Sequence, residues 1–182
     1  MAKRPASDTI AAIATAPGTG GIGIVRISGP EASATLRRVF VPRRPLDRFT
    51  SHQLYYGTVI APDGQPLDEA LAVPLPAPHP YTREDVVDLH CHDSYLVLQE
   101  VLRHVLALGV RPAEQGEFTK RAFLAGRIDL TRAEAVMDLL QAQTTRSARF
   151  AVNQLQGQLA DLLAAIRDEL VNLLALLDRA TP

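Results

Sequence analysis

The distribution of proline constrains the fold of this 182-residue chain more than any other feature of its sequence. Twelve of the 13 prolines lie at or before Pro112, and none occurs between Pro112 and Pro182. Because proline lacks the amide hydrogen that helix interiors and central strands use, it marks the ends of regular elements. The first part of the chain is therefore divided into short elements, whereas the part after Pro112 can form longer helices.

The proline-rich part has the pattern of short strands mixed with helices. Residues 9–15 (TIAAIAT) and 22–28 (IGIVRIS) predict two strands, which a glycine-rich turn at 17–21 separates. Pro30 suits the first turn of a helix that continues over residues 31–40.

The following residues continue this mixture. Residues 51–61 and 67–75 flank the segment Pro62-Asp63-Gly64-Gln65 and predict a β-hairpin. The prolines at positions 74, 76, 78 and 80 then predict an irregular, exposed loop. We expect a strand over DVVDLHCH (85–92) and a helix over 95–108 that ends at Gly109. The sequence thus predicts an α+β fold for this part.

Regularly spaced apolar residues dominate the proline-free part. They step at threes and fours and predict one apolar stripe on a single helix: Leu155, Leu159, Leu162, Ile166, Leu170, Leu173 and Leu177. Packing against sister helices explains the stripe better than a self-standing coiled coil, because the spacing is not a strict heptad. No sister helices follow before Pro182, so we expect an absent segment or another subunit to cover the apolar stripe.

Composition excludes several classes of protein. With 47% hydrophobic residues the chain can bury a core, so it is not disordered. Its net charge of −1 argues against a protein that binds nucleic acid with its whole surface, and 5% aromatic residues provide few platforms for base stacking. Cys91 is the only cysteine, which excludes an internal disulfide and indicates a reducing, cytoplasmic location. No apolar run is long enough for a membrane span.

Two nucleotide-binding motifs can be tested against the sequence. Gly18-x-Gly20-x-x-Gly23 matches the dinucleotide fingerprint, but that mechanism requires the third glycine to open a helix. Here IVRIS, a predicted strand, follows it, so a turn or a close backbone approach is the better interpretation. Gly followed by Lys occurs nowhere, so the chain lacks a Walker A loop and we expect no GTP, Mg²⁺ or K⁺ site in it.

The segment His90-Cys91-His92-Asp93 contains metal-ligating side chains. In a strand, however, His90 and His92 face one side while Cys91 and Asp93 face the other. No second ligand pair with zinc-like spacing exists, so packing and hydrogen bonding are favoured over a metal site. A nucleophilic Cys–His pair is a still weaker interpretation, because the side chains of adjacent strand residues point to opposite faces.

Other charged residues carry no specific catalytic pattern. Glu114, Glu117 and Asp129 could act as acids or bases, but solvated faces and helix N-terminal charges explain them better. Five arginines surround a predicted loop: Arg37, Arg38, Arg43, Arg44 and Arg48. For this basic run a solvated surface is favoured over RNA contact. We name no catalytic residue.

Three stretches resemble the MnmE (TrmE) family of tRNA-modification GTPases. The first runs from Asp8 through TIAAIATAPGTGGIGIVRISGP and resembles the family's N-terminal signature. The second is GEFTKRAFLAGRIDLTRAEAVMDLLQAQT (116–144), and the third is ARFAVNQLQGQL (148–159). The resemblance runs over essentially the whole chain.

The resemblance implies a fold and a division into domains. The family's N-terminal domain is similar to the tetrahydrofolate-binding domain of aminomethyltransferases and forms a homodimer. A helical domain follows, with a GTPase domain inserted into it. By this resemblance residues 1–126 form the folate-binding and dimerisation domain, and residues 127–182 form the first helices of the helical domain. The chain is then either a fragment or a natural protein without the GTPase domain.

The resemblance also implies a reaction. Together with an FAD-containing partner, MnmG (GidA), the family modifies the wobble uridine (U34) of certain tRNAs. A folate one-carbon unit supplies the added methylene, so 5-formyl- or 5,10-methylene-tetrahydrofolate is the expected cofactor. We expect tRNA to be bound indirectly, through the complex.

Three residues match the family's folate contacts. Arg26 is identical to the family's folate-binding arginine. Asp88 replaces a glutamate, and its carboxylate can accept paired hydrogen bonds from a pterin. Arg127 replaces a lysine and keeps a positive charge that suits a folate carboxylate.

The segment from Leu89 to Ser94 departs from the family, which has approximately Gln-Gly-His-Gly-Gly there. Only His92 matches, and Cys91, Asp93 and Ser94 add side chains where the family has backbone alone. Two functional hypotheses follow: a folate-binding component of tRNA modification, and a dimerisation scaffold of the same fold that has lost its ligand. A third, remote hypothesis is an unrelated enzyme built on the His-Cys-His-Asp segment.

Overall fold

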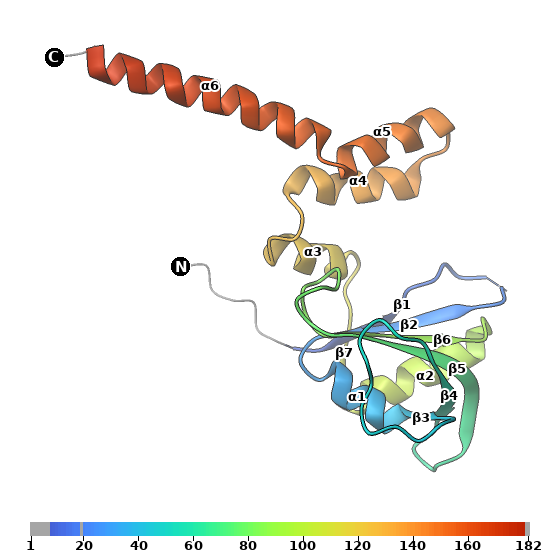
Figure 1. Ribbon diagram of the computed structural model, residues 1–182. Coiled ribbons are helices and arrows are strands. Elements are labelled where there is room, and N and C mark those ends of the chain that lie inside the picture. Colours follow the sequence, from blue (N-terminus) through green and yellow to red (C-terminus); the bar gives the residue numbers. More distant parts are fainter. Residues whose placement is uncertain (1–7, 19, 181–182) are drawn as a thin grey trace. The chain divides into compact units, whose positions relative to one another are not determined.

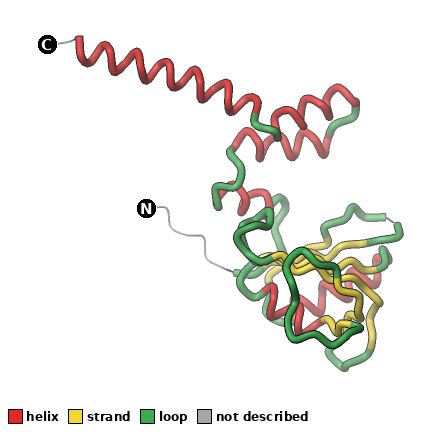
Figure 2. Tube along the Cα trace, viewed as in Figure 1, coloured by secondary structure: helices red, strands yellow, loops and turns green. Residues whose placement is uncertain are grey.

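The computed structural model describes residues 8–18 and 20–180, and the side chains among them except those of 159–161 and 177–180 (Figure 1). These residues form two compact units, one ending at Ala125 and the other beginning at Gly126. Strands occur in the first unit, and the second is helical (Figure 2). The mixed architecture confirms the predicted α+β class.

One sheet of seven strands forms the frame of the first unit. The strands are β1 (Ile10–Ile13), β2 (Gly23–Ser28), β3 (Phe40–Pro42), β4 (Tyr55–Ile60), β5 (Pro66–Leu75), β6 (Val86–Cys91) and β7 (Arg111–Pro112). Their order across the sheet is β3-β4-β5-β6-β2-β1-β7. All neighbours are antiparallel except β1 and β7, which are parallel. The expected hairpin is confirmed as β4 and β5.

Two helices and one face of the sheet enclose the core. Helix α1 (Ala32–Val39) contributes Leu36 and Val39, and α2 (Tyr95–Ala107) contributes Val101 and Val105. They pack with buried strand residues that include Val25, Ile27, Val87 and Leu89. Since strand side chains alternate between faces, Arg26 and Asp88 lie on the opposite face of the sheet.

Hydrogen bonds and ion pairs connect helix α3 (Glu117–Leu124) to the rest of the first unit. The Tyr81 hydroxyl donates to Thr119 at 3.3 Å, and Arg121 pairs with Asp8 and Glu84. Gly116, which precedes α3, and Gly109, which follows α2, both have positive φ, of 74° and 93°. The predicted end of the helix at Gly109 is therefore confirmed.

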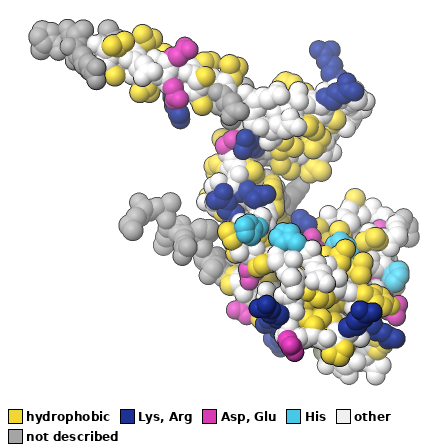
Figure 3. All heavy atoms as spheres, viewed as in Figure 1, with side chains coloured by type: hydrophobic (Ala, Val, Ile, Leu, Met, Phe, Trp, Pro, Cys, Tyr) yellow, Lys and Arg dark blue, Asp and Glu magenta, His cyan; other side chains and the backbone are white. Residues whose placement is uncertain are grey.

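The second unit consists of α4 (Leu130–Gln141), α5 (Thr145–Leu155) and α6 (Gln158–Ala180). Asp129 caps α4 and Thr144 forms a capping box with Ser147 at α5. The predicted single helix through the leucine stripe is wrong at its start, because Gly157 has φ 93° and separates α5 from α6. Along α6, apolar side chains are exposed (Figure 3).

Two further expectations need correction. Pro74 is not in a loop: it lies buried in β5, where its carbonyl accepts a hydrogen bond from the His52 amide at 3.0 Å. Pro80 is also buried, so the loop after β5 is only partly exposed. Helix α1 spans Ala32–Val39, so it begins two residues after Pro30 and ends before Phe40, which starts β3. No helix in the described ranges is long and apolar enough to cross a membrane.

Candidate functional site

Arg26 and Asp88 lie side by side on neighbouring strands. They are direct partners in the register of β2 and β6. Arg26 Nε donates to Asp88 Oδ1 at 2.8 Å and Nη2 donates to Oδ2 at 2.7 Å, so the pair is bidentate. These hydrogen bonds raise the pKa of Arg26, although burial opposes the shift. Two of the three predicted folate contacts are thus adjacent, but each is bound to the other.

The free space beside this pair is small. A cavity of about 50 Å³ adjoins Arg26 and is lined by the segment Pro80-Tyr81-Thr82, together with Leu75, Val86 and Phe118. Sites for drug-sized ligands are typically about 300–1,000 Å³. The cavity can hold water but not a fused pterin ring. The Arg26 side chain is nevertheless 33% exposed, so it can be reached from solvent outside this cavity.

Arg127 belongs to the second unit, where it is exposed two residues before the α4 cap Asp129. Its grouping with Arg26 and Asp88 therefore stays a prediction.

The His-Cys-His-Asp segment does not act as one cluster. Cys91 is buried in the core, and burial raises the pKa of its thiol to about 12, so it is a poor nucleophile. His92 is exposed and paired with Asp68 through Nδ1–Oδ1 at 2.6 Å, and this hydrogen bond raises its pKa. Among the described residues, no group of three His, Cys, Asp or Glu side chains could hold a metal ion.

The glycine-rich turn is explained by close packing. Gly23 is the first residue of a strand, β2, as predicted, which removes the context of a dinucleotide site. A Cβ on Gly20 would lie 2.7 Å from Asp93 Oδ2, and one on Gly23 would overlap Leu98. Asp93 also lines a hollow of about 220 Å³ with Pro17, Gly18 and Tyr95. Asp93, one of the departures from the family pattern, therefore fills space against these glycines.

An ion-pair network, not foreseen from the sequence, accounts for one proposed catalytic carboxylate. Glu117 accepts hydrogen bonds from Arg111 at 2.5 Å and Arg121 at 3.0 Å. Both arginines also bind Asp8, at 2.7 and 2.6 Å. Hydrogen bonding from Arg111 lowers the pKa of Glu117 from 4.5 to about 2, although burial opposes it. Glu117 is a buried anion in the first turn of α3, which confirms the interpretation as a helix N-terminal charge and corrects the alternative of a solvated face.

Asp129 is the N-cap of α4, so it carries a helix N-terminal charge, as favoured from the sequence. Its carboxylate accepts from the Arg132 amide at 2.9 Å and from the Thr131 hydroxyl at 2.6 Å. These hydrogen bonds lower the pKa of Asp129, and the bond from the Thr131 hydroxyl contributes most. The residue is a helix cap, as expected for a charge at a helix N-terminus.

Two family models match the chain. The model described as "GTP-binding protein TrmE N-terminus" matches residues 9–127, and the model described as "MnmE helical domain" matches residues 130–180. The first alone covers more than half of the chain.

Named relatives match along nearly the same length. The "tRNA modification GTPase MnmE" of Desulfotalea psychrophila is 51% identical over 174 residues, which cover 96% of this chain and 37% of the relative. Those of Symbiobacterium thermophilum and Geobacter sulfurreducens are 51% and 52% identical, each covering 94% of this chain and 38% of the relative. The chain therefore spans a little over a third of the length of these curated relatives. On the strength of these matches, this chain belongs to the MnmE (TrmE) family.

Proposed function

We propose that this chain is the folate-binding and dimerising part of an MnmE-type tRNA-modification GTPase. The observation that carries the proposal is the 51% identity to a named tRNA modification GTPase over 96% of this chain. Because the chain has no Gly-Lys pair, we assign it folate binding and dimerisation and not GTP hydrolysis.

The proposed reaction is modification of the tRNA wobble uridine in the cytoplasm, with an MnmG-type partner. Tetrahydrofolate, as the 5-formyl or 5,10-methylene form, supplies the one-carbon unit when it is bound. This chain's residues bind and orient that group: Asp88 accepts hydrogen bonds from the pterin, and Arg26 and Arg127 provide positive charge.

The chemistry of these side chains fits a folate, but the free space beside Arg26 does not. Asp88 has about four acceptor positions, of which its two bonds to Arg26 occupy two. The adjoining cavity of about 50 Å³ is also smaller than typical ligand sites. A pterin that enters this cavity therefore requires its lining to move.

The alternative is a dimerisation scaffold without a ligand. The mutual pairing of Arg26 and Asp88, the small cavity and the side chain of Asp93 packed against Gly20 favour it. In this alternative the Arg26–Asp88 pair is a structural link between β2 and β6.

Calorimetric titration with 5-formyltetrahydrofolate tests the proposal, with Arg26→Ala and Asp88→Asn as variants. Losing a charged hydrogen-bonding partner is expected to weaken binding by at least about tenfold. Arg103→Ala is the matched control, because Arg103 is exposed on α2 and pairs with the neighbouring Glu100. Light scattering after size exclusion measures whether each variant is still a dimer.

The outcomes separate the two functions. Saturable binding that both variants weaken and the control retains supports the folate-binding role. A folded, dimeric chain that does not bind would instead establish the scaffold. A folded monomer would contradict both.

A further inference from the structure

Five arginines form an exposed surface at the end of α1 and in the segment after β3. This basic surface consists of Arg37, Arg38, Arg43, Arg44 and Arg48, all exposed. None of the five makes an ion pair within the described part of the chain. In contrast, Arg26, Arg111 and Arg121 are all neutralised by carboxylates. The positive charge of this surface is therefore uncompensated by the unit that carries it.

The segment that carries three of these arginines is held in place. Phe49 packs on Phe40 at 6.4 Å and on Tyr55 at 5.0 Å between ring centroids. The Arg43 amide donates to the Tyr56 carbonyl at 2.9 Å. These contacts fix the backbone, so the arginines project from a defined frame.

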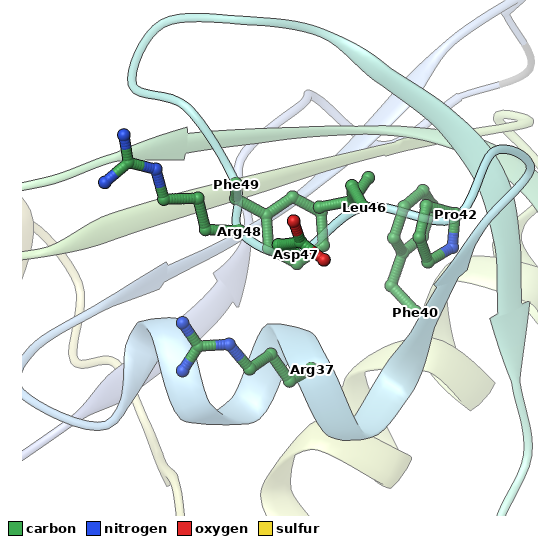
Figure 4. A pocket seen from close by; sticks show the side chains of 7 residues that line it. All are labelled: Arg37, Phe40, Pro42, Leu46, Asp47, Arg48 and Phe49. Carbon is green, nitrogen blue, oxygen red and sulfur yellow. The ribbon is translucent and has the colours of Figure 1, made fainter.

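Two open hollows lie within the basic surface. One, of about 190 Å³, is lined by Arg37 and Arg48 with Phe40 and Phe49 at its base. Figure 4 shows the side chains of Arg37 and Arg48 extending toward the same side of this hollow. The other, of about 510 Å³, is lined by Arg43, Arg44 and residues that include Leu54 and Tyr56. Asp47 is the only carboxylate that lines either hollow.

This arrangement suits a chain of phosphates more than a single small anion. Guanidinium groups bind phosphate oxygens in pairs. Because the hollows are open and the arginines are spread over both, a ligand must extend across the surface to reach several of them. A nucleic-acid backbone has that form, and the exposed ring of Tyr56 can contact a base.

We propose that the basic surface binds the phosphate backbone of the tRNA substrate directly. The inference rests on the proposed function, which provides the RNA. It differs from the indirect binding of tRNA expected from the resemblance, and it gives the exposed arginines a ligand. With a net charge of −1, the chain does not attract RNA over its whole surface, so a local patch must provide the attraction.

The salt dependence of binding to an unmodified tRNA transcript tests this proposal, measured by fluorescence anisotropy with the full 182-residue chain. The variant is Arg43→Gln with Arg44→Gln. Losing two phosphate contacts is expected to reduce the slope of log K against log salt by about 2 and to weaken binding about tenfold at low salt. The matched control is Arg103→Gln with Arg167→Gln, because these exposed arginines pair with neighbouring carboxylates.

Arg43→Lys with Arg44→Lys keeps the charge and is expected to retain the salt slope. An unchanged slope in the glutamine variant, an equal loss in the control, or no binding of tRNA by the wild-type chain overturns the proposal. Binding of the chain to anionic lipid vesicles but not to tRNA would also overturn the proposal. Folate titration of the same variants separates this result from the proposed function, since the hollow that Arg43 and Arg44 line shares no residue with the cavity beside Arg26. A wild-type chain that does not bind folate, together with a salt slope that falls in the glutamine variant, would contradict the folate role alone.

Discussion

Glu117 is buried in the first turn of α3, where it is the shared acceptor for Arg111 and Arg121. We expect Glu117→Gln to lower the free energy of unfolding by about 3 kcal/mol, because it removes the buried one of the two anions that Arg111 and Arg121 share. Urea unfolding at neutral pH measures the change. Glu100→Gln is the control: this carboxylate forms an exposed pair with Arg103, so its loss is expected to change stability by less than about 1 kcal/mol.

The difference in stability between the wild-type chain and Glu117→Gln is expected to depend on pH. The pKa of Glu117 is lowered from 4.5 to about 2 in the folded state. Its carboxylate therefore stabilises the fold fully above the unfolded value, and this contribution is lost as the pH falls through the folded one. The stability difference between wild type and Glu117→Gln is expected to shrink between about pH 4.5 and pH 2. A difference that stays constant over this range would contradict the role of the ionised carboxylate.

Whether the contacts of a residue could be predicted from the sequence depends on how far along the chain its contact partners lie. The strand over 85–92 could be predicted from local pattern, and in β6 its alternation of sides places Cys91 in the core. Asp8 and Arg111 are 103 positions apart, and no local pattern connects them. The Arg26–Asp88 pairing likewise depends on the register of two strands that are distant in the sequence.

At the level of elements, Gly57 in β4 determines how closely β3 can approach. A Cβ there would overlap the Val41 carbonyl oxygen and lie 2.8 Å from Pro42 Cα. Backbone atoms cannot rotate away as a side chain can, so we expect Gly57→Ala to destabilise the chain by about 2–3 kcal/mol. Gly21→Ala is the control, because a Cβ there meets nothing within 4 Å. Equal unfolding midpoints in urea for the two variants would show that β3 is not held in this way.

The hairpin of β4 and β5 could be predicted because its turn residues are local and specific. The break between α5 and α6 could not, since the leucine spacing continues through Gly157 and glycine alone does not end a helix. In the structure Gly157 has positive φ, and the space beside it is occupied by the Arg132 guanidinium. Strands β3 and β7 are too short to leave a pattern.

At the level of the whole molecule, the Arg26–Asp88 pair and the basic surface belong to different elements of the first unit. Arg26 and Asp88 lie on β2 and β6, whereas the five arginines lie on α1 and after β3, which forms the edge of the sheet beside β4. The basic surface can therefore be changed without replacing Arg26 or Asp88, and RNA binding and folate binding become independently measurable.

Helix α6 gives the last prediction, because its described apolar side chains are exposed. From Leu162 to Leu176 the large apolar side chains are between 48% and 61% exposed: Leu162, Leu163, Ile166, Leu170, Val171, Leu173, Leu174 and Leu176. Apolar surface of this extent favours association. We expect the chain to form assemblies larger than a dimer as its concentration rises, detectable by sedimentation velocity.

Leu173→Glu and Asn172→Glu form a matched pair for this test, because each adds one negative charge at adjacent positions on different sides of α6. Leu173→Glu removes an apolar side chain from the stripe, which is expected to weaken association by about 2 kcal/mol, or roughly thirtyfold in the dissociation constant. Asn172→Glu leaves the stripe intact and is expected to associate like the wild type, apart from a small effect of net charge. If both variants lose association equally, charge repulsion and not the apolar stripe controls it, and the leucines of α6 have no such role.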